Sequence, residues 1–503
     1  MGIWEGLAYG LNVIIDDPLI LVLLFLGSMA GTIVGALPGL GAVSGCALLL
    51  PIAYTLGSPE KGLLLLSTIY LGNMFGGRIT AILINVPGDA PAVVTAIEGY
   101  PMYKQGRGGL AMGITAISSF IGGFVSFILL AGFAPPLARL ALNFGPAELL
   151  MVIVFGFAAI IGIEEEQPLR SLIMLCFGVL ITNIGIDLVS GVARYTFTFE
   201  LFDGIPFALI AIGVFGLSEM FKTAEEIHSY AKIEGTKDFS VRKMWPTWKE
   251  FKSCIGAITR GTFLGSYIGF LPGAGGTVAT FLEYSLEKGI SKHPEEFGKG
   301  NLQAIAGCEA ADNSSIGGAM IPLFALGIPG SSSAAIIMGA MIMFGIKPGP
   351  RVFITSGNIV WTVIVGLFVS NIMLLLANIF LIPLFIKLID VGQKYLKQIV
   401  CTIIMVGAYA ITYSNFFLIV CLFFGIFGYF MSKLKYPVAP FMLTLVLFQS
   451  CEEAFRQALL ISRGNYSIFW QSGISKVLII MSLAALIVPP IRRRLKRKKA
   501  AAA

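Results

Sequence analysis

The feature that most limits how this chain can fold is its series of long apolar segments. Two of them, at 204–221 and 473–490, approach the roughly 20 residues that a helix needs to cross a bilayer. Charged residues make up 13% of the 503 residues, about half the share of a soluble domain. Because only helices and closed barrels satisfy their backbone in lipid, and these segments have helical length, we predict an all-α polytopic membrane protein with roughly 10–14 spanning helices.

Motifs for catalysis or for nucleotide and zinc binding do not occur in the sequence. Its two histidines, His228 and His293, lie in polar segments, and no HExxH, G-x-S-x-G or Walker pattern occurs. The seven cysteines show no CxxC pairing, which argues against a disulfide framework and a zinc site. Much of the net charge of +7 comes from the run 492–499. We therefore expect no enzyme, no catalytic residues, no bound cofactor, no ATP hydrolysis by this chain and no nucleic-acid partner.

The basic residues predict how the chain divides and how it is oriented. The polar segment 222–255 carries seven Lys and Arg residues, and the run RRRLKRKK follows the last apolar segment. Basic flanks mark the cytoplasmic side of a membrane protein. We therefore expect a first transmembrane half (1–221), a cytoplasmic linker (222–255), a second transmembrane half (256–491) and a basic cytoplasmic tail (492–503).

A glycine-rich motif occurs twice, as GSMAGTIVGALPGLG at 27–41 and GTFLGSYIGFLPGAG at 261–275. A Pro-Gly motif follows each copy, NVPGDAPA at 85–92 and GIPGSSSA at 327–334. The matched positions of the first motif are separated by 234 residues: Gly27 and Gly261, Gly31 and Gly265, Gly35 and Gly269, Pro38 and Pro272, Gly39 and Gly273, Gly41 and Gly275. Such a match indicates an internal repeat.

The two copies are predicted to enter the membrane from opposite sides. No Lys or Arg precedes Lys61, whereas the basic linker precedes the second copy, so the first copy enters from outside and the second from the cytoplasm. Two similar halves of opposite orientation form an inverted-topology repeat, which is typical of secondary transporters. We expect re-entrant hairpins and broken helices, with an elevator-like movement as the preferred form of alternating access.

The proline in each glycine motif separates two roles. Glycines spaced by four residues allow close packing of membrane helices, which we favour for Gly27 to Gly35. Proline removes a backbone donor, and an unwound backbone at membrane depth must line protein or a wet cavity. Half-helix N-termini attract anions and freed carbonyls bind Na⁺. The predicted substrate-binding residues of these tips are Pro38, Gly39, Gly41, Gly273 and Gly275.

The Pro-Gly motifs add side chains that can hydrogen-bond a carboxylate. Amides, hydroxyls and backbone N–H groups beyond a Pro-Gly break all serve this purpose. An ordinary surface turn is the alternative, although long apolar segments flank both motifs. The candidates are Asn85, Gly88, Asp89, Gly330, Ser331 and Ser332.

Arg78 lies within an apolar stretch, and ionisable groups at membrane depth are costly and often functional. Its guanidinium could bind a substrate carboxylate in a bidentate manner. The alternatives are a structural partnership with an acid and snorkelling to the membrane interface.

A cation site is predicted in the segment GCEAADNSS at 307–315. Glu309, Asp312 and Asn313 fall on neighbouring helical faces and could supply oxygen ligands for Na⁺, together with Asn85, or a proton-binding carboxylate. The alternative is that one of them faces a loop at the start of a helix.

Taken together, the motifs resemble the TctA family, the large membrane subunit of the tripartite tricarboxylate transporters. The resemblance runs from about residue 18 to 490 and rests on GTIVGALPGLG, GGRITAILINVPGDAPAVVTAIEGYPM, GFLPGAGGTVATFLEYSLEK, FGKGN, EAADNSS and GIPGSSSAA. It implies a multi-pass bacterial inner-membrane protein that imports a carboxylate with a small membrane subunit of the TctB type and a periplasmic binding protein of the TctC type. The driving force would be a Na⁺ or proton gradient.

The resemblance places a set of residues on the family's signature positions: Pro38, Gly39, Gly41, Arg78, Asn85, Pro87, Gly88, Asp89, Pro272, Gly273, Gly275, Glu309, Asn313, Pro329, Gly330 and Ser331. The family often has proline at Cys308 and asparagine at Asp312, and the additional acid leaves the type of cation open. We therefore predict a secondary importer of a small di- or tricarboxylate, with a channel or a permease subunit of an ATP-driven system as the alternative.

Overall fold

A computed structural model describes residues 1–37, 40–163, 168–187, 190–225, 244–382, 384–385 and 401–502. The first half contains α1 (Ile3–Asp16), α2 (Pro18–Gly35), α3 (Ala42–Thr55), α4 (Pro59–Ile84), α5 (Ala92–Lys104), α6 (Gly108–Ala141), α7 (Pro146–Ile163), α8 (Pro168–Thr182), β1 (Gly185–Ile186), β2 (Ala193–Arg194), η1 (Phe199–Leu201), α9 (Phe207–Ala211), η2 (Ile212–Leu217) and α10 (Ser218–Glu225). The second half contains α12 (Trp248–Phe270), α13 (Gly275–Ile290), η4 (Pro294–Glu296), α14 (Leu302–Leu326), α15 (Ser332–Met343), α16 (Val352–Thr355), α17 (Gly357–Phe380), α19 (Asn415–Lys433), α20 (Val438–Ile461), α21 (Ile468–Gln471) and α22 (Gly473–Ala502).

Apart from the short antiparallel pair β1–β2, the regular secondary structure of the described residues is helical, and five helices are long and apolar enough to cross a membrane. These are Pro18–Gly35, Gly108–Ala141, Gly357–Phe380, Asn415–Lys433 and Val438–Ile461. Shorter apolar helices accompany them, so the protein is a multi-pass membrane protein. The expected total of spanning helices stays a prediction.

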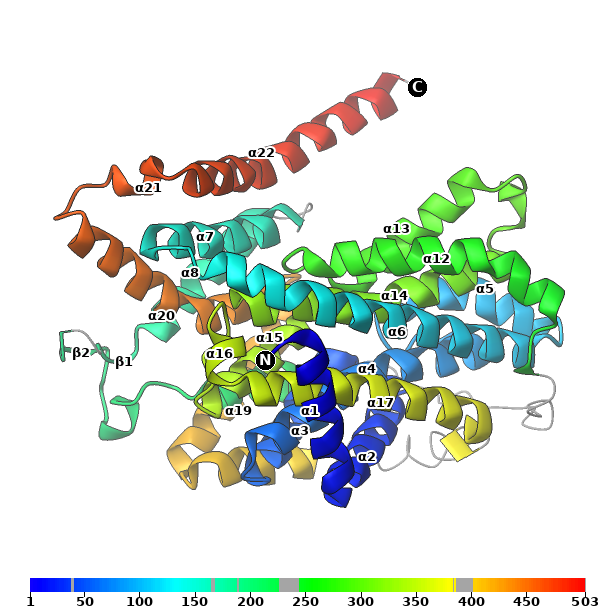
Figure 1. The fold of residues 1–503 in the computed structure, drawn as a ribbon, viewed down its shortest axis with the longest axis horizontal. Coiled ribbons are helices and arrows are strands. Elements are labelled where there is room, and N and C mark those ends of the chain that lie inside the picture. Colours follow the sequence, from blue (N-terminus) through cyan, green and yellow to red (C-terminus); the bar gives the residue numbers. More distant parts are fainter. Residues whose placement is uncertain are drawn as a thin grey trace.

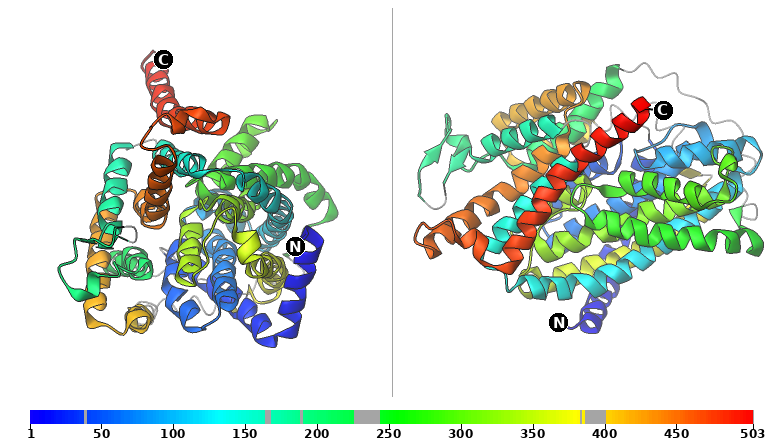
Figure 2. Two further views of the ribbon diagram at one scale, coloured as in Figure 1. Left: turned by 60° about the vertical axis from the view of Figure 1, so that its left-hand side comes forward. Right: turned by 90° about the horizontal axis from the view of Figure 1, so that it is seen from above.

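The helices form two groups that lie beside one another (Figure 1). The tip-bearing group comprises α2–α6, α12–α15 and α17, in which α4 and α14 are buried along most of their length. The flanking group comprises α7, α8, α19, α20 and α22, with α7 packed on both α20 and α22. Figure 2 shows α22 crossing outside the rest of the molecule. This arrangement places the four chain breaks inside the tip-bearing group.

The glycines of the two repeated motifs allow α2 to lie against α4 and α12 against α14. A Cβ atom on Gly31 would lie 2.5 Å from the Ile69 carbonyl oxygen, and one on Gly265 would lie 2.1 Å from the Ala311 carbonyl oxygen. No side chain larger than hydrogen fits at these contacts. The predicted packing role of these glycines is therefore confirmed.

The helices are interrupted where the sequence predicted breaks. The interruptions lie at 36–41, 85–91, 271–274 and 327–331, between α2 and α3, α4 and α5, α12 and α13, and α14 and α15. Pro38 and Gly39 lie outside the described residues.

The helices leave a shorter segment between the two halves than the predicted linker 222–255. Helix α10 continues to Glu225, and α12 begins at Trp248. Thr247 caps α12, because its hydroxyl accepts a hydrogen bond from the Glu250 N–H and Glu250 bonds back to the Thr247 N–H. Residues 226–243 lie outside the described residues.

Candidate functional site

All four chain breaks meet at one cavity of about 480 Å³. Its wall is made by residues from each break and from α4: Gly41, Ala42, Val43, Tyr70, Met74, Pro87, Gly88, Asp89, Ala90, Pro91, Val93, Gly273, Ala274, Gly275, Gly276, Thr277, Ser331, Ser332 and Ser333. Residues from both halves of the sequence therefore form one site.

The cavity receives the N-termini of four helices. The N-cap residues of α3, α5, α13 and α15 are Gly41, Pro91, Ala274 and Ser331, and all four line the cavity. A helix N-terminus carries a partial positive charge and free N–H groups, which together favour an anion. The described wall contains no Lys, Arg or His and includes one acid, Asp89, so backbone groups and hydroxyl groups are the only parts of it that could attract an anion.

Glycine residues give the tips the backbone angles that this arrangement requires, and a serine supplies hydrogen bonds. Gly273 and Gly275 have φ angles of 80° and 58°, in the left-handed region where glycine is unstrained. The Ser331 hydroxyl accepts a hydrogen bond from the Ala334 N–H at 3.2 Å and lies 3.0 Å from the Tyr70 hydroxyl. Tyr70 is fully buried in α4, so its phenol fixes the position of the α15 tip.

Most of the predicted substrate residues reach this cavity. Those in its wall are Gly41, Gly88, Asp89, Gly273, Gly275, Ser331 and Ser332. Gly330 lies behind the wall, where its N–H bonds to the Ala319 carbonyl at 3.4 Å. Pro38 and Gly39 are not described.

Asn85 lies apart from the cavity wall. It is exposed and ends α4 in the left-handed conformation, with a φ angle of 56°. Asparagine tolerates this conformation better than other non-glycine residues. The corresponding residue at the end of α14 is Gly327, with a φ angle of 71°, so a backbone role accounts for the residue at this position.

For the carboxylate importer that the sequence predicts, we expect Asn85→Gly to retain transport and Asn85→Ala to lower it, because only glycine keeps the left-handed backbone without strain. The measurement is uptake of labelled carboxylate into vesicles that contain equal amounts of each variant. Equal loss in both variants would instead assign a role to the amide side chain.

Arg78 is buried in an ionic network and does not line the cavity. Its Nη1 atom lies 3.6 Å from Glu309 Oε2 and donates to the Ser119 hydroxyl at 2.8 Å. Glu309 also accepts hydrogen bonds from Thr95 at 2.6 Å and Ser119 at 2.9 Å. The Arg78 guanidinium lies 4.6 Å from the centre of the Phe75 ring. This geometry favours the structural alternative, in which Arg78 pairs with an acid.

The four predicted cation ligands are not gathered at one point. Asn85 is exposed, Glu309 is engaged by Arg78, and the Asn313 amide donates to the Glu309 carbonyl at 3.2 Å. Asp312 differs, because it is only 4% exposed and its Oδ1 atom has no hydrogen-bond partner. Within the described ranges, no group of three or more His, Cys, Asp or Glu residues is arranged to hold a metal ion.

Sequence reasoning missed Glu98, which joins α5 to the start of α14. Its fully buried carboxylate accepts hydrogen bonds from the N–H groups of Gly298 (2.6 Å), Gly300 (2.8 Å) and Asn301 (2.7 Å). The Tyr284 hydroxyl also donates to it at 2.8 Å. The motifs TAIEGYPM and FGKGN are therefore two parts of one contact.

Replacing Glu98 by glutamine should lower the melting temperature of the detergent-solubilised protein. The amide group would face N–H donors, and each lost bond to a charged acceptor contributes about 1.5–3 kcal/mol. Glu295→Gln is the matched control, because that carboxylate is 65% exposed. Equal melting temperatures for the two variants would contradict this role for Glu98.

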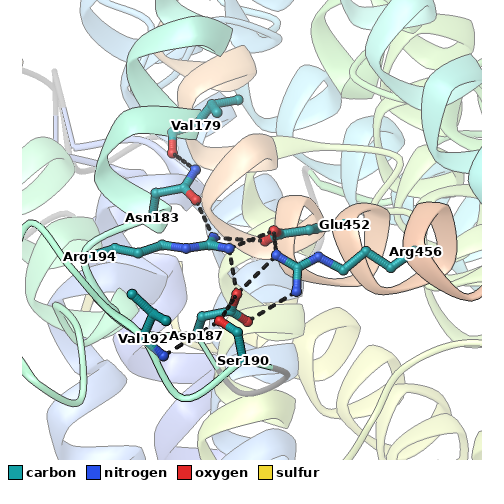
Figure 3. Close-up of polar contacts among 8 residues, drawn as sticks. All are labelled: Val179, Asn183, Asp187, Ser190, Val192, Arg194, Glu452 and Arg456. Atoms are coloured by element: carbon teal, nitrogen blue, oxygen red, sulfur yellow. Dashed lines mark hydrogen bonds and ion pairs between the residues drawn. The ribbon is translucent and has the colours of Figure 1, made fainter.

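A second cavity of about 440 Å³ lies beside the β1–β2 hairpin, where two arginines and two acids form a clamp (Figure 3). Arg194 contacts Asp187 at 2.6 Å and Glu452 at 3.1 Å, and Arg456 contacts the same two residues at 2.9 and 2.5 Å. The hydrogen bond to Glu452 raises the pKa of the Arg194 guanidinium. Because both arginines are engaged by acids, this cluster holds the hairpin on α20.

Comparison with known proteins shows which protein family the chain resembles. Residues 21–443 match the family described as "Tripartite tricarboxylate transporter TctA family". The chain is 38% identical over 484 residues to an uncharacterised 52.8 kDa protein in the TAR-I ttuC' 3' region of Agrobacterium vitis, covering 95% of each chain. It is 35% identical over 233 residues to an uncharacterised protein in the TAR-II ttuC' 3' region of the same organism, covering 46% of this chain and 96% of that one. No solved structure matches the chain.

Proposed function

Since the chain belongs to the TctA family of the tripartite tricarboxylate transporters, we propose that it imports a small di- or tricarboxylate by alternating access, driven by a Na⁺ or proton gradient. The observation that carries this proposal is the meeting of four helix N-termini at one cavity. Their partial positive charges suit several carboxylates at once, although the Ala92 N–H already bonds to Asp89 and the Ala334 N–H to Ser331. A cavity of about 480 Å³ is in the range that binds small molecules.

The arrangement of the helices supports an elevator-like form of alternating access. The tip-bearing group carries the whole cavity wall, and the flanking group packs at its side (Figure 1). A movement of the first group against the second would carry the cavity without dismantling it. The π-helical turns of η2, Ile212–Leu217, lie between the groups, where α3 and α19 both contact them. Such turns occur often at functional sites.

The proposed setting is the bacterial inner membrane, with the basic C-terminus of α22 in the cytoplasm. The partners are a small membrane subunit of the TctB type and a periplasmic binding protein of the TctC type, as the family's tripartite organisation implies. The β1–β2 hairpin and α21 lie at the opposite end of α20 from the loop at Leu434 and Lys435, where Arg170 of α8 binds the backbone. The hairpin would thus face the periplasm.

Reconstituted uptake separates this proposal from a channel and from an ATP-driven permease subunit. Vesicles that contain the chain and its two partners should accumulate labelled carboxylate only when a Na⁺ or pH gradient is imposed. Accumulation that requires ATP, or flux that follows only the substrate gradient, would overturn the proposal.

Ser331→Ala should lower uptake several-fold and leave the amount of folded protein unchanged. The change removes the N-cap of α15, which contributes about 1 kcal/mol, and its contact with Tyr70. Tyr70→Phe is the comparison, because it removes the same contact and keeps the cap. Unchanged uptake in the Ser331 variant would remove this tip from the site.

A further inference from the structure

We infer that Asp89 and Asp312 together hold one monovalent cation, Na⁺ or a proton, beside the cavity, and that the repeat provides only one such site. The inference rests on the proposed carboxylate importer. It specifies which residues would hold the coupling cation and how many cations one chain would bind.

The two halves make matching contacts, so that residues of one half can be paired with residues of the other half. The Gly88 N–H bonds to the Gly77 carbonyl at 3.3 Å, and the Gly330 N–H bonds to the Ala319 carbonyl at 3.4 Å. Both pairs are related by the same shift of 242 residues. The same shift relates Asn85 to Gly327, which end α4 and α14 in the left-handed conformation. The correspondence therefore holds in the structure from α4 and α14 into the tips.

This correspondence relates a neutral pair to an acidic pair. Tyr70 of α4 and Ser331 of the second tip join their hydroxyls at 3.0 Å. Their repeat-related residues are Asp312 of α14 and Asp89 of the first tip, at the same shift of 242 residues. Asp89 lies in the cavity wall, and Asp312 Oδ1 lies beside Gly276 of the same wall, so the two carboxyl groups interact through their charges. The neutral half-site, Tyr70 and Ser331, is closed by a contact between two hydroxyl groups. The acidic half-site, Asp89 and Asp312, presents two carboxyl groups.

The acidic half-site also lacks a methyl group that the repeat-related position carries. A Cβ atom on Gly276 would lie 2.3 Å from Asp312 Oδ1, 3.2 Å from Ser315 Oγ and 3.4 Å from Pro91 Cγ. The repeat-related residue of Gly276, at the shift of 234 residues, is Ala42, which already carries this methyl group. Without this methyl group, Asp312 Oδ1 and Ser315 Oγ lie beside the backbone of Gly276 in the cavity wall, and a Cβ atom there would displace the Asp312 carboxylate.

The charges around this point require a cation. Asp312 Oδ1 and Asp89 Oδ2 are both buried without a hydrogen-bond partner. The Asp312 carboxyl group has two acidic neighbours, Asp89 and Glu309, and one basic neighbour, Arg78. Three carboxylates and one guanidinium leave two excess negative charges, of which one monovalent cation would neutralise one, and a carboxylate substrate adds more. Buried charges are stable only when paired, so a cation between the aspartates would make the binding of an anionic substrate depend on it.

Equilibrium binding of radioactive Na⁺ to the purified full-length chain in detergent tests this inference without substrate or partners. Asp312→Asn and Asp89→Asn should each weaken Na⁺ binding about tenfold or more, equivalent to at least about 1.4 kcal/mol. Gly276→Ala should do the same without a change of charge, because its methyl group would collide with Asp312 Oδ1 and displace that carboxylate. Glu295→Gln, which removes an exposed carboxylate, should bind Na⁺ as the parent protein does.

A proton at the same place would give a different result. The parent protein would then bind no Na⁺, and its melting temperature would vary between pH 5 and 8 in a way that the Asp89→Asn and Asp312→Asn variants lose. Binding of Na⁺ that is unaffected by all three variants, or no Na⁺ binding together with equal pH profiles, would overturn the inference. Absent uptake with Na⁺ binding intact would instead overturn the proposed importer and leave the cation site standing.

Discussion

Replacing Arg78 by methionine should destabilise the folded protein by about 3–5 kcal/mol, because the change leaves the Glu309 carboxylate buried without its ionic partner. Both side chains are at most 3% exposed, and their closest atoms are 3.6 Å apart. Thr95 and Ser119 would still donate to Glu309, but neutral hydroxyls cannot balance its charge. Thermal melting of the detergent-solubilised protein, followed by size-exclusion chromatography, measures the loss.

The double variant Arg78→Met/Glu309→Gln separates a structural role from substrate binding. Removing both charges leaves no unpaired ion, and replacement of a buried pair is often neutral in stability. We therefore expect the double variant to melt above the Arg78→Met variant and to recover part of the uptake. A double variant that melts normally but transports nothing would instead support substrate binding by Arg78.

The chain breaks could be predicted from the sequence because their causes are local. Proline removes a backbone donor, and glycine permits the left-handed angles found at Gly273 and Gly275. Each break therefore lies at its own Pro-Gly motif. The repeat also indicated that the tips of both halves have the same role. The tips of both halves do line the cavity.

The partners of the buried side chains could not be predicted, because they come from distant parts of the chain. Tyr70 and Ser331 are 261 residues apart, and Glu98 binds an N–H group 200 residues away. No local pattern identified Tyr70, since an aromatic residue in an apolar helix is usually part of the core. Asn85 shows the converse case, because a polar residue beside a Pro-Gly break suggested a ligand, whereas its left-handed conformation and its place outside the cavity wall favour a backbone role.

Two rules predict some of these contacts from the sequence. An acid in an otherwise apolar helix needs a partner, and Glu98 and Glu309 both follow this rule. Comparison of the halves at the shift of 242 residues would also have related Asp89 to Ser331 and Asp312 to Tyr70. Sequence alone cannot show which of these residues meet, since that depends on the packing of α5 on α14 and of α15 on α4.

Gly88→Ala should abolish uptake while the protein still folds. A Cβ atom there would lie 1.8 Å from the Gly35 carbonyl oxygen, so the first tip must move away from the end of α2. Overpacking of this kind costs about 1–3 kcal/mol, which a membrane protein of this size can tolerate. The proposed function cannot tolerate a shift of the helix N-termini around the cavity, because it makes anion binding depend on their convergence.

Gly330→Ala should have the same effect, since its Cβ atom would lie 2.1 Å from the Gly269 carbonyl oxygen in the second half. Gly132→Ala is the matched control, because nothing lies within 4 Å of its Cβ position in α6. Uptake per folded protein, with the folded amount read from size-exclusion chromatography, is the measurement. Full uptake by either tip variant would mean that the helix ends need not converge, and the carboxylate would then have to be bound by side chains instead.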